Sequence, residues 1–164
     1  MDRQQIALAL VLQEAGIPLS VDTFDHRLIL QKATYLLQGV GVPLGYHFRW
    51  YLYGPYSPEL TQDVFAITSG HARIEQEIKG TQLAEPAAAK AGRLRELLGG
   101  TSLHDQAQKL ELLASVLFLL RTKQGTADAP DLIASLLQAY KKPFTTEQVK
   151  QGLVFLRQHE FLNS

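Results

Sequence analysis

The sequence predicts a mainly helical α+β fold: a compact helical domain with one aromatic strand and a small β-hairpin. Apolar residues recur at helical spacing through most of the chain, and signals for helix starts and ends bound these stretches. Only two segments, 46–52 and 72–85, show the alternation typical of strands. Helices followed by a hairpin also describe a winged helix, which is an alternative form of this fold.

The chain is expected to form one domain over residues 1–164, since single cores typically span ~100–200 residues. Its 46% hydrophobic and 20% charged residues are typical of a globular protein. The sequence contains no repeat, no low-complexity tract and no linker long enough to divide it.

Two helices are expected in the first forty residues. The first covers 3–15 and ends at Gly16, and the second covers 24–38, with Asp22 as its N-cap and Gly39 after it. Apolar residues occupy most of the second helical wheel, so this helix should be largely enclosed. Only a narrow polar ridge is expected on it, formed by Arg27, Gln31, Thr34 and Gln38.

The segment YHFRWYL (46–52) is predicted to be a strand, with alternate residues from Tyr46 facing the core. Ser57 followed by Pro58 then predicts the start of a helix that runs to about residue 68. The segment 72–85 is expected to form a hairpin turning at Lys79 and Gly80. Four more helices are predicted, at 86–98, 104–123, 129–140 and 146–158.

Composition excludes several classes of function. Sixteen basic residues balance sixteen acidic ones, so net charge does not indicate binding to nucleic acid. The chain has no cysteine, and no two of its five histidines stand three or four residues apart, so neither a metal nor another cofactor is expected. Neither a phosphate-binding loop nor a nucleophile motif is present. We therefore expect a protein that is not an enzyme.

The chain is expected to be cytoplasmic. The apolar run Ile6–Leu12 is seven residues long, which is too short to cross a bilayer, and it lacks a basic segment before it and a cleavage site after it. It is interpreted as part of a helix that enters the core, and no association with a membrane is expected.

Lys32 lies within the apolar arc of the predicted helix 24–38, between Leu28 and Leu36. Its stem could lie along the core while the ammonium reaches solvent at the edge. Alternatively, the ammonium meets a specific carboxylate or tyrosine hydroxyl, because an unpaired buried charge is costly.

Six of the fourteen aromatic residues fall between Tyr46 and Tyr56, together with Arg49 and without any acidic residue. Tyrosine, tryptophan and arginine are enriched at binding hot spots, because they combine a large contact area with a polar group. The same residues also fill a small core efficiently. Composition alone leaves both interpretations open for this stretch.

Two motifs resemble a known group of proteins. The first is LQKATYLLQ (30–38), and the second is YGPYS (53–57), which follows the aromatic strand and opens the next helix. Together, over about 27–69, they resemble the YwgA-like proteins and the wider Panacea (SocA-like) antitoxin group, and they are similar to the C-terminal domain of DarG antitoxins. This resemblance implies a small helical protein without enzymatic activity that binds another protein, such as a cognate toxin.

The sequence thus predicts an antitoxin-like or adaptor protein that binds a partner protein around the YGPYS turn. Tyr53 is expected to be buried, and Arg49 and Tyr51 to lie nearer the surface. The alternative is a winged-helix DNA-binding regulator, although the helix after the turn lacks lysine and arginine. The candidate site comprises the contact residues Arg49, Tyr51, Tyr53 and Tyr56, with Gln31 and Lys32 beside them, Gly54 and Pro55 fixing the turn, and Ser57 capping the helix.

Overall fold

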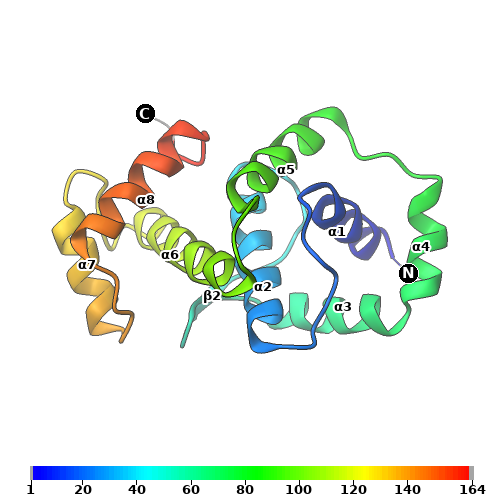
Figure 1. Cartoon of the computed structure of the whole chain (residues 1–164), viewed down its shortest axis with the longest axis horizontal. Coiled ribbons are helices and arrows are strands. Elements are labelled where there is room, and N and C mark those ends of the chain that lie inside the picture. The colour runs from blue at the N-terminus through cyan, green and yellow to red at the C-terminus, as the bar shows by residue number, and fades with distance from the viewer. Residues whose placement is uncertain (1, 163–164) are drawn as a thin grey trace.

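The computed structural model describes residues 2–162, and within that range it contains eight helices and one two-stranded antiparallel sheet (Figure 1). The predicted mainly helical fold is therefore confirmed. The elements are α1 (Arg3–Glu14), α2 (Phe24–Gly39), β1 (Arg49–Tyr51), β2 (Gly54–Tyr56), α3 (Pro58–Ser69), α4 (His71–Lys79), α5 (Glu85–Leu98), α6 (Leu103–Arg121), α7 (Pro130–Ala139) and α8 (Thr146–Gln158).

Helices α2 and α6 form the centre of the molecule. They pack against each other along their lengths, with α5 and β2 also against α2 (Figure 1). Helices α1, α3, α4 and α5 lie to one side of this pair, and α7 and α8 lie to the other. The prediction of a polar ridge on α2 is wrong at two positions, because Gln31 and Thr34 are buried like their apolar neighbours.

Within residues 2–162, five of the eight helices begin with a capping side chain, and one predicted cap is corrected. The N-cap of α2 is Thr23 rather than Asp22, because the Thr23 hydroxyl accepts a hydrogen bond from the backbone N–H of His26. Ser57 caps α3 as predicted, with Pro58 in its first turn. A capping box formed by Thr145 and Gln148, whose sequence spacing is typical of that motif, is present at the start of α8.

The predicted hairpin at 72–85 is wrong, because residues 71–79 form helix α4. Ile74 and Ile78 are four residues apart, a spacing that places two residues on one face of a helix as well as on one face of a strand. Ile74 is fully buried, and α4 packs against α1. On the exposed side, the pairs His71–Glu75 and Arg73–Glu77 have the i,i+4 spacing that supports a helix.

The hairpin instead lies at residues 49–56. Strand β1 pairs with β2 in a register that places Tyr51 opposite Gly54, so Leu52 and Tyr53 form the two-residue loop between them. The aromatic strand and the hairpin, predicted as two separate elements, are thus one. Residues 46–48 lie outside the ladder, and the alternation breaks at Leu52, which is 76% exposed at the loop.

Candidate functional site

Two glutamines of α2 hold the segments on either side of the hairpin. The Gln38 side chain accepts from the backbone N–H of Tyr46 and donates to its carbonyl, at 2.7 and 2.9 Å. Gln31 does the same for Ser57, with both distances 2.9 Å. Each glutamine amide therefore makes the two backbone hydrogen bonds that a neighbouring strand would otherwise make. The spacing of seven residues puts both glutamines on one face of α2. The hydrogen bonds between Gln31 and Ser57 join the first sequence motif to the second.

Lys32 holds the hairpin itself. Its ammonium donates to the backbone carbonyl of Pro55 at 2.7 Å, and the side chain is buried. The partner is thus a carbonyl, neither of the two acceptor types expected from the sequence. The pKa of Lys32 is lowered from 10.5 to about 7, chiefly by burial and secondly by the charge of Lys142, while the charge of Glu111 opposes the shift.

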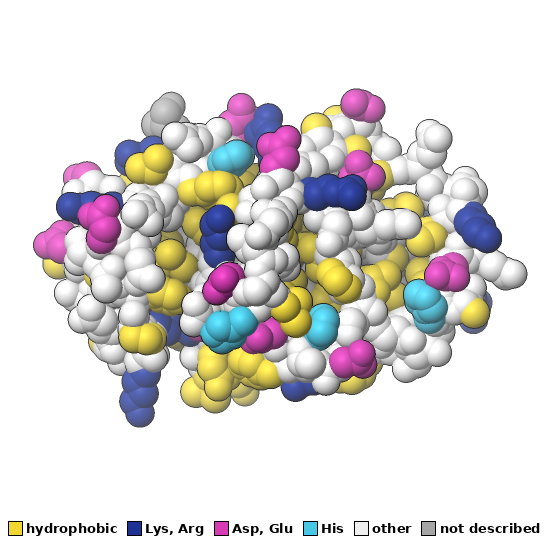
Figure 2. All heavy atoms as spheres, in the orientation of Figure 1, with side chains coloured by type: hydrophobic (Ala, Val, Ile, Leu, Met, Phe, Trp, Pro, Cys, Tyr) yellow, Lys and Arg dark blue, Asp and Glu magenta, His cyan; other side chains and the backbone are white. Residues whose placement is uncertain are grey.

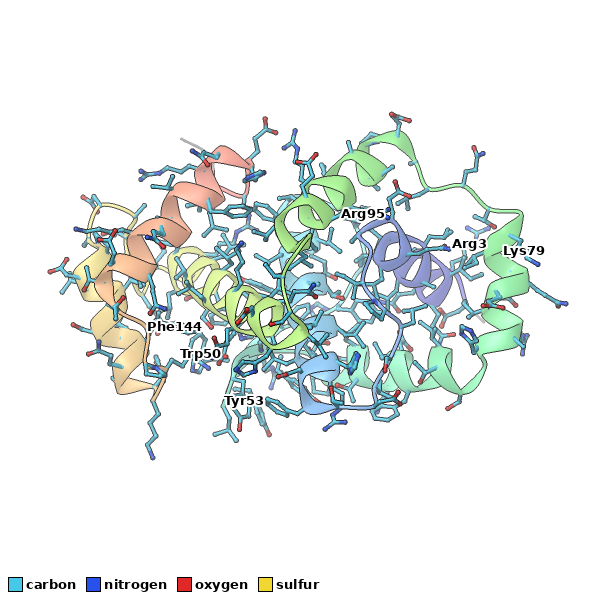
Figure 3. All side chains as sticks on the ribbon, in the orientation of Figure 1. Arg3, Trp50, Tyr53, Lys79, Arg95 and Phe144 are labelled. Carbon is cyan, nitrogen blue, oxygen red and sulfur yellow. The ribbon has the colours of Figure 1, made fainter. Side chains whose placement is uncertain are left out.

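Lys142, which precedes α8, is a second buried lysine at the hairpin. Its ammonium donates to the carbonyl of Leu52 at 3.1 Å and to the carboxylate of Glu111 at 2.7 Å. It also lies over the rings of Trp50 and Tyr53, 5.8 and 5.6 Å from their centroids. Figure 3 shows these two rings near the hairpin, with Tyr53 at the lower edge of the molecule. Lys142 carried no sequence signal, because it follows another lysine in a polar turn.

The turn depends on Gly54. Its φ angle is +93°, in the left-handed region that glycine adopts without strain. A Cβ atom at this position would lie 2.6 Å from the Ser115 hydroxyl and 3.7 Å from the Lys32 ammonium. The hairpin backbone therefore packs directly on α6 at this point.

An exposed apolar surface surrounds the hairpin loop. Tyr51 is 61% exposed and Leu52 is 76% exposed, and the neighbouring rings of Phe24 and Tyr53 meet edge to face at 4.9 Å. Figure 2 shows apolar side chains gathered at the lower edge, where the hairpin lies in Figure 1. We call this the hairpin surface and define it by Phe24, Tyr51, Leu52, Tyr53 and Phe65.

The prediction that Tyr53 is buried is wrong, since the side chain is 49% exposed. Tyr53 is in the loop, beyond the last ladder pair, so no facing strand covers it. Arg49 and Tyr51 are exposed, as expected. Tyr56 is partly buried, and its ring packs against that of Tyr51 with the ring centroids 5.4 Å apart.

A pocket of about 180 Å³ opens beside the hairpin surface, between α2, α3 and the hairpin. Four aliphatic side chains contribute to its walls, and the rings of Phe24, Tyr53 and Phe65, each about half exposed, stand at its rim. The residues that line it are Val21, Phe24, Arg27, Leu28, Leu30, Gln31, Lys32, Tyr53, Tyr56, Thr61, Val64 and Phe65.

Hydrogen bonds join the polar groups in this pocket. The Thr61 hydroxyl accepts from the Gln31 amide at 2.8 Å and lies 2.8 Å from the Tyr56 hydroxyl. An apolar pocket with a few convergent polar groups is the usual form of a binding site. The arrangement can therefore hold an apolar group and hydrogen-bond a polar atom attached to it.

The nine predicted site residues separate into two groups. Five are buried and hold the turn: Gln31, Lys32, Gly54, Pro55 and Ser57. The other four can be reached at least in part from solvent: Arg49, Tyr51, Tyr53 and Tyr56.

Sequence reasoning missed eight of the twelve residues that line the pocket, among them Phe24, Arg27, Thr61 and Phe65. Phe24 and Arg27 begin α2, and Thr61 and Phe65 lie four residues apart on α3. The i,i+4 spacing of Thr61 and Phe65 put them on one helical face, but nothing local showed that this face meets α2.

Within residues 2–162, no cluster of three or more His, Asp or Glu side chains is arranged to hold a metal ion. No helix in that range has the length and apolar character needed to cross a membrane. Comparison of the chain with family models, with curated proteins and with solved structures found no match. The resemblance carried by the two motifs therefore stays a prediction.

Proposed function

We propose that this protein binds a partner protein through the hairpin surface and has no catalytic activity of its own. The exposure of Tyr51, Leu52 and Tyr53 together, on a hairpin that buried lysines hold in place, is the observation that carries this proposal. Contiguous exposed apolar side chains mark interaction sites, and a preorganised loop loses little entropy on binding.

We further propose that the protein acts in the cytoplasm as an antitoxin-like protein or adaptor, and that a toxin is the partner to test first. The motif resemblance supports this assignment, and the structure gives the motifs a role, since Gln31, Lys32 and Gln38 hold the aromatic turn in its exposed position. The DNA-binding alternative gains no support from α3, which contains Glu59 and Asp63 but no lysine or arginine.

The first experiment is co-purification of tagged wild-type protein with the products of neighbouring genes and with native lysate, repeated with Tyr51→Ala and Leu52→Ala. Each substitution is expected to weaken partner binding by ~30-fold, the effect of losing a hot-spot contact. Each should change the free energy of unfolding by no more than about 0.5 kcal/mol, as is usual for exposed positions. Titration calorimetry and thermal melts measure the two quantities.

Leu132→Ala is the matched control, because Leu132 is an apolar residue of α7 that is 60% exposed outside the hairpin surface. It should bind the partner as the wild type does. Equal binding by all the variants would contradict the proposal, and so would the absence of any partner for the wild type. Binding to a random DNA duplex that falls steeply with salt would favour the DNA-binding alternative instead.

A further inference from the structure

The geometry points to the pocket beside the hairpin as the subsite for one large apolar side chain of the partner, flanked in the partner by an acidic residue. This inference rests on the proposed function and names the chemistry that the partner presents. Three properties of the pocket support the inference: its size, its capacity to donate a hydrogen bond and the charge at its rim.

The pocket has the size of one side chain. Its volume of about 180 Å³ is slightly larger than a cavity of ~150 Å³ that holds benzene. The walls offered by Leu28, Leu30 and Val64 are aliphatic. A phenylalanine or leucine side chain thus fits, with the rings of Phe24 and Phe65 closing around it at the rim.

The polar groups in the pocket have a hydrogen to donate. Gln31 uses both amide hydrogens, on the Ser57 carbonyl and on the Thr61 hydroxyl. Tyr56 and Thr61 carry two hydroxyl hydrogens but share one hydrogen bond, so one hydrogen is left over. That hydrogen can be donated to an acceptor oxygen of the ligand, such as the backbone carbonyl beside the inserted side chain.

The charge at the rim is positive. Arg27 lines the pocket and uses one guanidinium N–H on the Val21 carbonyl. It makes no ion pair within the described part of the chain, and no acidic residue is among those that line the pocket. The nearby Asp25 faces His104 of α6 at 3.3 Å. The ammonium of Lys32 is bonded to Pro55 beneath the hairpin, so Arg27 is the cation that a partner's carboxylate would meet.

Two blocked dipeptides test this inference without the partner: N-acetyl-phenylalanyl-glutamate amide and N-acetyl-phenylalanyl-lysine amide. Each is titrated into methyl-labelled full-length protein, and the NMR signals of Val21, Leu28 and Val64 are followed. The signal of Val154, which is exposed on α8, serves as the control.

We expect saturable shifts of the pocket methyls, with Val154 unchanged and the glutamate peptide bound at least about threefold more tightly, as expected for one exposed ion pair. Arg27→Gln should abolish the preference for glutamate, and Arg27→Lys should retain it. Equal affinities for the two peptides in the wild type, or no shift at the pocket methyls, would overturn the inference.

Tyr51→Ala keeps this test separate from the proposed function. Tyr51 is outside the pocket lining, so the variant should bind the glutamate peptide as the wild type does while losing the partner. If Tyr51→Ala and Leu52→Ala weaken partner binding but the peptides do not shift the pocket methyls, the hairpin surface binds a partner and the inferred subsite is wrong. Shifts with the predicted preference, but without any partner, would support the subsite and contradict the proposed function.

Discussion

Gly54→Ala is expected to lower the free energy of unfolding by roughly 2–6 kcal/mol. A residue with a Cβ at φ +93° is strained by ~1–3 kcal/mol, and the added atom would lie 2.6 Å from the Ser115 hydroxyl, an overlap that costs ~1–3 kcal/mol more. The Ser115 side chain is fully buried on α6, so it has little room to move. Chemical denaturation of the purified variant measures the loss, and Gly54→Val should lose at least as much.

Two controls separate the causes of this loss. Gly100 has a φ of +78°, and a Cβ added there would meet no atom within 4 Å, so Gly100→Ala should show the backbone strain alone. Combining Gly54→Ala with Ser115→Ala removes the hydroxyl. The double variant should therefore regain the stability that the overlap costs, about 1–3 kcal/mol. If the change in unfolding free energy of the double variant equals the sum of the changes in the two single variants, the two positions are not in contact.

Ser115→Ala by itself should be neutral or stabilising. The Ser115 hydroxyl is buried and has no hydrogen-bond partner among the described residues, and an unsatisfied buried hydroxyl costs ~1–3 kcal/mol. A loss of stability in this variant, measured by the same denaturation, would show that the hydroxyl has a partner in solution.

The stability of the protein should rise between pH 7 and pH 9.5 because of Lys32. Its pKa is about 7 in the folded state and about 10.5 in the unfolded state, so the unfolded chain binds the extra proton throughout this range. Raising the pH makes binding of that proton less favourable, which disfavours the unfolded chain. The loss of stability caused by Lys32 is absent well above pH 10.5, grows as the pH falls and is complete below pH 7. From pH 7 to 9.5 the gain is roughly 2–3 kcal/mol.

Lys32→Met tests the source of this dependence, because methionine keeps a long apolar stem and removes the ionisable group. Urea denaturation at half-unit pH steps should show the rise in the wild type and a flatter profile in the variant. Lys150→Met, at an exposed position of α8, should keep the wild-type rise. Identical profiles for the wild type and Lys32→Met would mean that Lys32 titrates alike in the folded and unfolded chains.

Local signals were sufficient for most helices. Ser57 with Pro58, and Thr145 with Gln148, place the starts of α3 and α8 because capping involves residues close in sequence. The same signals failed for α4. Ile74 and Ile78 suit a strand as well as a helix, and only packing against α1 decides between them.

The candidate site was less predictable than the helices. The aromatic turn and its glycine could be recognised, because a left-handed turn restricts the residue types that form it. The pocket could not, since its walls come from α2 and α3, which are brought together only by folding. Tyr53 was placed wrongly for a related reason: exposure in a hairpin loop depends on which residues pair, and the pairing partner of β1 was not identified.

By itself, the sequence determined where most helices begin and end, that the chain turns at Gly54, and that aromatic residues gather there. The tertiary structure decided which polar residues are buried and what they hold. Lys32, Glu111 and Lys142 meet at the hairpin from three distant parts of the chain. Helical periodicity describes only which face of its own element a residue occupies. Whether that face meets solvent, a carbonyl or another charge depends on the element packed against it, and that is settled only when the chain folds.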